Sequence, residues 1–156
     1  MNGGWLVDRS ALVKLGDSVD AAAWADRIQQ GRVRTSSITR LEIGYWARSA
    51  DQARRAFRSA PLAVMPIEHL TAAAESRAME VQLLLADLAP QGRHRAPAVP
   101  SLLVAATAEL AGLTVLHADE DFDLIASVSL QPIERVRMVP GVTTKSVRSP
   151  MHQPVR

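Results

Sequence analysis

Two acidic residues directly follow short apolar segments that lie far apart in the chain. The segment "GWLVD" ends in Asp8, and "LTVLHADEDFD", residues 113 to 123, ends in acids that include Asp119. In a parallel sheet, ligands bind at the carboxyl ends of the strands, so these two carboxylates could meet at one edge and serve a common ligand. Asp is also a favoured N-cap of a helix that follows a strand. The sequence therefore leaves both a ligand-binding role and a capping role open for each.

A third acid, Glu42, stands within a helical pattern. Ile38, Leu41, Glu42 and Tyr45 fall at i, i+3, i+4 and i+7, which places the carboxylate in the apolar stripe of a helix. Burial of an unpaired carboxylate costs on the order of several kcal/mol. The position therefore predicts a metal ion, an arginine or a polar cleft facing Glu42, and a metal and a buried Glu–Arg pair satisfy this requirement equally well.

Short apolar segments alternate with helical patterns along the chain. We expect strands at residues 4–8, 32–36, 62–67, 113–117 and 131–139. We expect helices at residues 9–15, 18–31, 36–50, 52–60, 67–89, 101–112 and 120–128. Strands separated by helical crossovers predict an α/β fold, a three-layer sandwich in which helices flank a short central parallel sheet.

Length and composition limit the class of protein. A chain of 156 residues with 47% hydrophobic and 22% charged residues predicts one globular domain, here residues 1–139, followed by a flexible tail at 140–156. The absence of cysteine excludes disulfides and thiolate metal sites. No apolar stretch is long enough to span a membrane, and the N-terminus lacks the pattern of a secretory signal. We expect a cytoplasmic protein with no membrane partner.

Arginine dominates the basic residues, sixteen of eighteen, although the net charge is only +2. The guanidinium group pairs bidentately with phosphate, so two arginine clusters are candidate RNA contacts. Arg54 and Arg58 share a helix face, and Arg93 and Arg95 lie in the predicted loop before the helix at 101–112. Ordinary solvated surface charge explains either cluster equally simply.

Several of these segments together resemble the PIN-domain family (PilT N-terminus ribonucleases), in particular the VapC-type toxins of bacterial toxin–antitoxin pairs. The segments are "LVDRSALVKL" with Asp8, "SSITRLEIGYWARS" with Glu42 and "PAVPSLLVAATAELAGLTVLHADEDFDLIA" with Asp119. The resemblance covers residues 5 to about 137. Each motif is short, and their order and spacing carry the likeness.

The resemblance implies a metal-dependent endoribonuclease that cleaves RNA phosphodiester bonds. By family position, Asp8, Glu42 and Asp119 would be direct or water-mediated ligands of Mg²⁺ or Mn²⁺, with Asp121 a nearby accessory acid of the catalytic site. The physical chemistry agrees, because hard divalent cations choose oxygen ligands and relieve the repulsion between converging acids. The resemblance also implies a homodimer and a cognate VapB-type antitoxin that neutralises the toxin.

One position departs from the family pattern. The family has another metal-binding Asp at the start of the Ala-rich helix, where "AVPSLLVAA" has Ser101. Serine brings no negative charge, so we expect weaker metal affinity. Three accounts remain open: an engineered inactivating substitution, a naturally degenerate nuclease, or a serine that caps its helix while other acids suffice. An engineered change in an otherwise standard toxin is the account we favour.

Two further functional classes compete with the nuclease. A catalytically dead PIN fold would bind RNA or protein without cutting, and Ser101 is the residue that separates it from the enzyme. A response-regulator-like domain could also hold Mg²⁺ at strand-end acids, but it requires a lysine at a later strand end. No lysine occurs between Lys14 and Lys145, which argues against this class.

Overall fold

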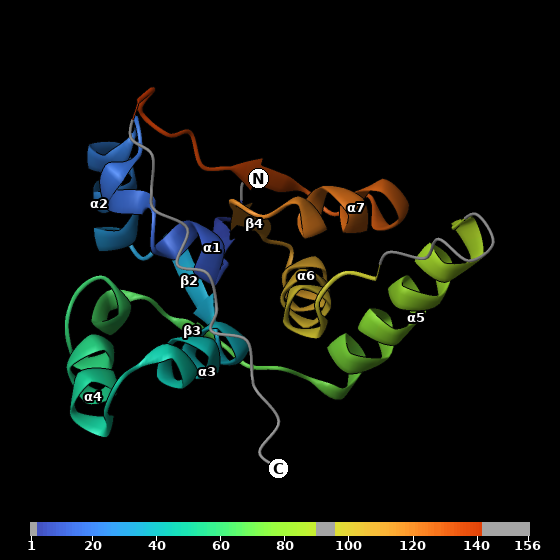
Figure 1. The fold of residues 1–156 in the computed structure, drawn as a ribbon, viewed down its shortest axis with the longest axis horizontal. Helices are drawn as coiled ribbons and strands as arrows, with labels where there is room; N and C mark the ends of the chain where they lie inside the picture. Colours follow the sequence, from blue (N-terminus) through green and yellow to red (C-terminus); the bar gives the residue numbers. More distant parts are fainter. Residues whose placement is uncertain (1–2, 90–95, 142–156) are drawn as a thin grey trace, which may run out of the picture.

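The computed structural model describes residues 3–89 and 96–141, and its centre is a sheet of parallel strands. The strands are β1 (Trp5–Val7), β2 (Val33–Ser36), β3 (Ile67–Glu68), β4 (Thr114–His117) and β5 (Ile133–Arg135). Their order across the sheet is β3-β2-β1-β4-β5, and every neighbouring pair is parallel (Figure 1). β1, the middle strand, therefore lies between β2 and β4.

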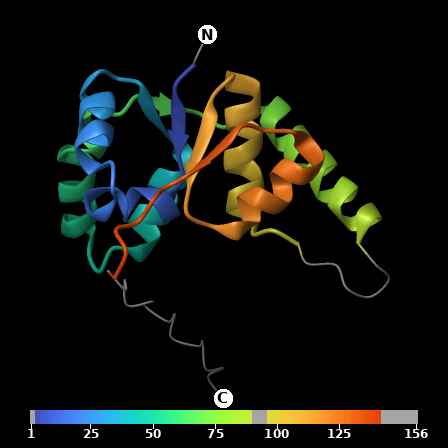
Figure 2. The ribbon, with the colours of Figure 1, turned by 90° about the horizontal axis from the view of Figure 1, so that it is seen from above.

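Helices cover both faces of the sheet. They are α1 (Arg9–Leu12), α2 (Ala21–Gln29), α3 (Ser37–Trp46), α4 (Ala50–Arg58), α5 (Ala72–Leu88), α6 (Val99–Ala111) and α7 (Glu120–Ser129), with short 3-10 helices η1 (Leu15–Asp17) and η2 (Leu62–Val64). Viewed from above, α1 to α4 lie on one side of the sheet and α5 to α7 on the other (Figure 2). The predicted three-layer α/β sandwich is confirmed.

Two hydrophobic clusters fill the space between the layers. Alternate residues of β1 point to opposite faces, so that Leu6 packs in one cluster while Trp5 and Val7 pack in the other. Val115 and Leu116 of β4 divide in the same way. Burial on both faces explains why these strands read as continuous apolar runs rather than alternating ones.

The strand predicted at residues 62–67 is wrong. Residues 62–64 form η2, and the strand β3 begins only at Ile67. Leu62 and Met65 are both buried, and this spacing of three residues follows a 3-10 turn rather than a strand. The helix predicted from residue 67 begins instead at Ala72, where the Thr71 hydroxyl accepts the N–H of Ala74 at 3.1 Å.

Two other element boundaries also differ from prediction. β5 spans three residues only, although residues 131–139 were expected to be strand, and Met138 instead makes an isolated antiparallel bridge with Ser18. α6 begins at Val99, two residues earlier than predicted, because Pro100 is tolerated in the first turn of a helix. Residues 142–156, most of the predicted flexible tail, lie outside the described residues.

The topology decides where functional side chains can meet. β1 and β4 are adjacent, with Val7 opposite Leu116, so the residues that follow both strands emerge at one edge of the sheet. β2 runs parallel on the other side of β1 and leads directly into α3. No helix in the described part of the chain is long and apolar enough to cross a membrane.

Candidate active site

Asp8 follows β1 and begins α1. Its Oδ2 accepts the backbone N–H of Ser10 at 2.8 Å, which makes it the N-cap of α1. The side chain is buried, and burial raises the pKa of Asp8, with a smaller upward contribution from the negative charge of Asp119. Hydrogen bonds from Ser10 act in the opposite direction and lower this pKa. Asp8 is therefore a costly buried charge with a defined orientation.

Asp119 occupies the equivalent place after β4. It caps α7, and its Oδ1 accepts the N–H of Asp121 at 2.9 Å. Asp8 and Asp119 are thus both helix caps, as one of the two open readings predicted. A carboxylate has two oxygens and several lone pairs, so the capping bond leaves each group able to bind a cation as well.

Glu42 lies half-buried on α3, beside the two aspartates. Burial raises its pKa to about 7, helped by the charges of Asp8 and Asp119 and opposed by Arg9. Its Oε2 is buried and has no hydrogen-bond partner among the described residues. Such an oxygen is a binding site that the folded chain leaves open.

The apolar stripe predicted around Glu42 is wrong in part. Ile38 is buried, but Leu41 and Tyr45 are exposed by 74% and 81%. The helical periodicity was correct, whereas the face that α3 turns to the core contains Ile38 and Thr39. The charges of Asp8 and Asp119 raise the pKa of Glu42 and that of Arg9 lowers it, so Glu42 lies near all three residues. The partner of Glu42, whether a metal ion, an arginine or a polar cleft, stays a prediction.

Asp8, Glu42 and Asp119 influence one another electrostatically. The charge of Asp119 raises the pKa of Asp8, and the charges of Asp8 and Asp119 both raise the pKa of Glu42. The three carboxylates therefore lie near one another. Within residues 3–89 and 96–141, however, no three His, Cys, Asp or Glu side chains are close enough to form a metal-binding group. The donor set suits a hard cation by its chemistry, since it is all oxygen and includes the unpartnered Oε2 of Glu42. A cation bound there would need water molecules or a small inward movement of side chains to complete its ligands.

Asp121, the predicted accessory acid, is buried in the first turn of α7. Its Oδ2 accepts the backbone N–H of Ala98 at 2.8 Å. Ala98 is the N-cap residue of α6 and provides no side-chain cap of its own. Asp121 therefore holds the start of α6 against α7.

Ser101 lies buried in the first turn of α6. The account in which Ser101 caps its helix is wrong, because the cap position is Ala98, three residues earlier. Pro100 at the first turn shifts the helix start toward the N-terminus of the segment. Ser101 thus lies within the first turn of α6. Asp121 contacts the same end of this helix, at Ala98.

The candidate RNA contacts divide into described and undescribed residues. Arg54 and Arg58 are exposed on α4, and Arg54 pairs with Asp51 at 2.8 Å. This pairing is a common surface arrangement and leaves the guanidinium accessible. Arg93 and Arg95 lie outside the described residues.

Sequence reasoning missed two residues of this region, Ser10 and His117. The hydroxyl of Ser10 accepts the N–H of Ala118 at 3.0 Å. The imidazole of His117 is fully buried, its Nδ1 lies 2.8 Å from the carbonyl oxygen of Asp119, and burial lowers its pKa. Their positions next to Asp8 and Asp119 in sequence were the available signal.

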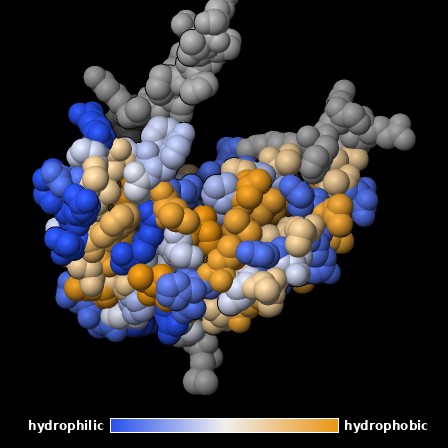
Figure 3. Space-filling model, turned by 90° about the horizontal axis from the view of Figure 1, so that it is seen from below, coloured by the Kyte–Doolittle hydropathy of each residue, from blue (hydrophilic) through white to orange (hydrophobic). Residues whose placement is uncertain are grey.

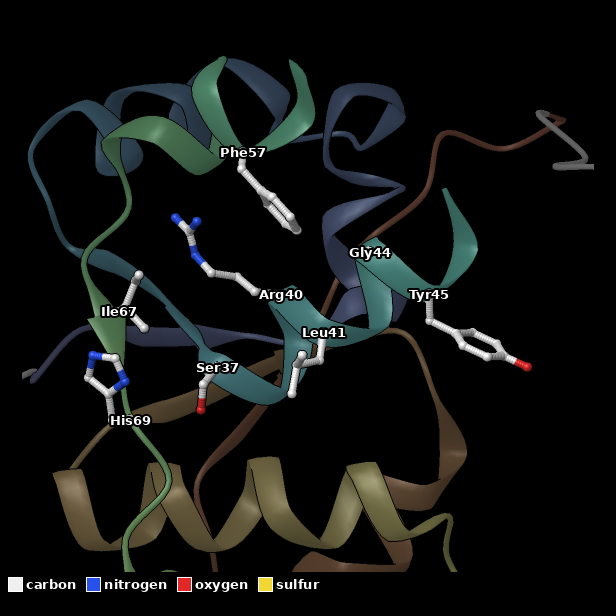
Figure 4. Close-up of a pocket in the computed structure, with 8 residues that line it drawn as sticks. All are labelled: Ser37, Arg40, Leu41, Gly44, Tyr45, Phe57, Ile67 and His69. Carbon is white, nitrogen blue, oxygen red and sulfur yellow. The ribbon is translucent and has the colours of Figure 1, made fainter. Parts of the chain in front are cut away.

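A separate apolar pocket of about 560 Å³ lies on a different face of α3. It is lined by Ser37, Arg40, Leu41, Gly44, Tyr45, Phe57, Ile67 and His69. In Figure 4 the Arg40 side chain extends toward Phe57, and Ile67 and His69 come from the segment of β3. None of the candidate acids lines this pocket, so it is distinct from the carboxylate site.

The sequence matches the PIN domain model over residues 5–128. The chain is 54% identical over 132 residues to Ribonuclease VapC2 of Mycobacterium tuberculosis (strain CDC 1551 / Oshkosh), which covers 85% of this chain and 92% of that protein. It is 37% identical over 130 residues to Ribonuclease VapC51 of Mycobacterium tuberculosis (strain ATCC 25618 / H37Rv), covering 83% and 90% respectively.

Solved structures share the fold. DNA-bound VapBC from Salmonella typhimurium superposes with a TM-score of 0.64 at 19% identity, covering 86% of this chain and 98% of that chain. VapBC-5 from Mycobacterium tuberculosis, a member of the VapBC family of toxin-antitoxin systems, gives a TM-score of 0.56 at 25% identity, covering 87% and 99%.

Proposed function

Since this chain belongs to the PIN-domain family and its relatives include VapC ribonucleases, we propose that it is a VapC-type toxin that cleaves RNA phosphodiester bonds internally. The alignments span 92% and 90% of these two relatives. This near-complete coverage supports the proposal that the chain has the same activity. Within the chain, residues 1–139 would form the catalytic domain. An RNA substrate is consistent with the cytoplasmic location that we propose.

The acids at the edge of the sheet would form the active site. Asp8, Glu42 and Asp119 would hold Mg²⁺ or Mn²⁺, directly or through water, and Asp121 would support them as an accessory acid. A divalent cation there would lower the pKa of a bound water and offset charge at the scissile phosphate. The observation that supports this most directly is the buried Oε2 of Glu42, which has no hydrogen-bond partner within residues 3–89 and 96–141 although the charges of two other acids act on it.

The residues of this chain would contribute binding and orientation. Asp8 and Asp119 are held by their capping hydrogen bonds, so their carboxylates are oriented before substrate arrives. The raised pKa of Glu42, about 7, allows it to exchange a proton near neutral pH whenever no cation holds it ionised. Arg54 and Arg58 on α4, with Arg93 and Arg95, would contact RNA phosphates.

RNA cleavage with and without cations tests the proposal. The chain should cut RNA in Mg²⁺ or Mn²⁺ and lose the activity in EDTA. Asp8→Asn, Glu42→Gln and Asp119→Asn should each abolish cleavage while the fold persists by circular dichroism. Glu75→Gln, a change at an exposed glutamate in the first turn of α5, is the matched control and should cut like the unaltered chain. Equal cleavage by all four variants would refute the assignment.

A catalytically dead PIN fold that binds RNA or protein is the second candidate, and Ser101 favours it. The side chain is neutral and buried at the position where the resemblance implies a metal-binding Asp. Cleavage by this chain and by Ser101→Asp should be compared in Mn²⁺. Activity only in the variant would identify an inactivated enzyme, whereas activity in neither, with RNA binding retained, would favour the binding module.

A cognate VapB-type antitoxin is the proposed partner, and a second copy of the chain is proposed to complete a homodimer. An antitoxin segment would fold across the active-site groove and present an Arg or Lys to the acids. For the homodimer, the support is apolar exposure on α3 and α5, where Leu41, Tyr45, Met79, Leu83 and Leu88 are all exposed. Figure 3 shows hydrophobic side chains gathered on the face seen from below. Light scattering of the purified chain, alone and with its antitoxin, would measure both assemblies.

A further inference from the structure

Two turns carry the aspartates of the proposed active site, and the pairing of β1 with β4 ends at the backbone N–H of Asp8. Val7 lies opposite Leu116, and the N–H of Asp8 donates to the carbonyl oxygen of Leu116 at 2.9 Å. Beyond this hydrogen bond the two chains part. β1 turns at once into α1, while β4 continues to His117 before the turn that carries Asp119.

Ser10 contacts both turns. Its backbone N–H donates to Oδ2 of Asp8 at 2.8 Å, and its hydroxyl accepts the N–H of Ala118 at 3.0 Å. Ala118 directly precedes Asp119, and it is 108 residues from Ser10 in the sequence. One residue therefore links a carboxylate on one turn to the backbone that positions the carboxylate on the other.

A hydroxyl is well suited to this position because it accepts and donates at once. While Oγ accepts from Ala118, its proton is available to Asp8, and hydrogen bonds from both the side chain and the backbone of Ser10 lower the pKa of that aspartate. Alanine would leave the part-buried N–H of Ala118 without this acceptor.

The turn on the β4 side is also stiffened from within. Nδ1 of the fully buried His117 lies 2.8 Å from the carbonyl oxygen of Asp119, and the Asp119 side chain caps α7. These contacts hold the backbone and the carboxylate of the turn together as one unit. The contact with Ser10 is the link that ties this unit to α1 at the N–H of Ala118.

We propose that Ser10 is a positioning residue that sets the separation between the carboxylates of Asp8 and Asp119. This inference rests on the proposed metal-dependent cleavage, because the separation matters for a cation shared by the two acids. Residues that orient metal ligands from behind commonly change metal affinity when they are removed.

Amide hydrogen exchange tests the link without any metal or RNA. In Ser10→Ala the amide of Ala118 should exchange about tenfold faster, while the amides of β1 and β4 keep their protection. Ser10→Thr retains the hydroxyl and should restore slow exchange. Unchanged protection of Ala118 in Ser10→Ala would overturn the proposal.

Metal binding and kinetics test the consequence. Ser10→Ala should weaken Mn²⁺ binding about tenfold or more, measured by electron paramagnetic resonance of free Mn²⁺, and Ser10→Thr should recover most of the affinity. At saturating Mn²⁺ the KM for RNA should stay near its original value while kcat falls. Ser18→Ala is the matched control, because it removes another hydroxyl hydrogen bond, to the carbonyl oxygen of Leu15 at 2.8 Å, without touching either turn.

The outcomes separate the two proposals. If Ser18→Ala weakens Mn²⁺ binding as much as Ser10→Ala does, the effect is general destabilisation and the positioning role is refuted. If the unaltered chain neither binds Mn²⁺ nor cuts RNA, the proposed function fails. In that case the exchange of the Ala118 amide still decides whether Ser10 joins the two turns.

Discussion

The backbone N–H of Ala98 donates to Oδ2 of Asp121 across 2.8 Å, which joins the start of α6 to the first turn of α7. The two residues are 23 positions apart, and both follow the undescribed residues 90–95. An acid that the family pattern places in the catalytic group thus has a structural contact of its own. Its effects on activity and on stability should therefore be measured separately.

Asp121→Ala should lower the free energy of unfolding by about 1–3 kcal/mol, because it removes the hydrogen bond between the buried carboxylate of Asp121 and the N–H of Ala98 at the start of α6. Urea unfolding measures this change. Asp123→Ala is the control on the same helix, since Asp123 is exposed and pairs with Arg135 at the surface. That pair should be worth less than about 1 kcal/mol. A larger loss in Asp123→Ala than in Asp121→Ala would contradict the assignment.

Ser101→Asp should make stability depend more strongly on divalent cations. A carboxylate at this buried position would add a negative charge at the end of α6 that Asp121 already contacts, so in EDTA we expect a lower melting temperature. A cation that binds only the folded state raises stability according to its concentration over Kd. Differential scanning fluorimetry with increasing Mn²⁺ should therefore show a larger upward shift for Ser101→Asp than for the unaltered chain.

Ser101→Asn provides the control for that experiment, because it has nearly the shape of aspartate and no charge. It should respond to Mn²⁺ like the unaltered chain. If Ser101→Asn and Ser101→Asp respond equally, position 101 does not face the cation site.

Much of the fold and the core of the candidate site could be predicted from local sequence. Apolar strands that end in Asp8 and Asp119 imply a shared sheet edge, because parallel strands place their carboxyl ends together. Glu42 was recognised because a charge in a helical apolar pattern requires a partner. In each case the signal lies within a few residues of the acid itself.

The rest depends on contacts that no local pattern contains. Periodicity locates the faces of α3 but cannot say which face meets the core, so the exposure of Leu41 and Tyr45 was not predicted. The contact between Ser10 and Ala118 joins residues 108 positions apart, and a serine after a capping aspartate looks like an ordinary helix residue. The six apolar residues at 62–67 fit a strand by composition, and only the burial of Leu62 with Met65 shows the 3-10 turn.

Glu42 should make the metal-free protein less stable as pH rises. Its folded pKa of about 7 lies above the ordinary value of 4.5, so the folded state holds the proton more tightly than the unfolded state does. The stability that this group contributes is complete below pH 4.5 and is lost as pH rises through 7. The raised pKa of Asp8 acts in the same direction.

Thermal unfolding in EDTA at pH 5 and pH 8 tests this dependence. Glu42→Gln mimics the protonated acid, so its melting temperature should exceed that of the unaltered chain at pH 8, and the difference should shrink at pH 5. Addition of Mg²⁺ or Mn²⁺ at pH 8 should stabilise the unaltered chain more than the variant, since only the unaltered chain can bind the cation with a charged Glu42. A difference that is the same at both pH values would show that Glu42 is not shifted by its surroundings.

Arg54 and Arg58 should affect RNA binding without affecting the fold. Both are exposed on α4, and Arg54 makes a surface pair with Asp51, so the double change to alanine should alter the free energy of unfolding by less than about 1 kcal/mol. If each contacts one phosphate, the slope of log affinity against log salt concentration should fall by about one for each arginine removed.

Fluorescence anisotropy with labelled RNA at several salt concentrations measures this slope, with catalysis suppressed by EDTA. Arg55→Ala is the control, because Arg55 is exposed on the same helix and is turned about 100° around the helix axis from Arg54. An unchanged slope in the double variant, or an equal change in the control, would remove α4 from the RNA-binding surface and leave the undescribed Arg93 and Arg95 as the remaining candidates.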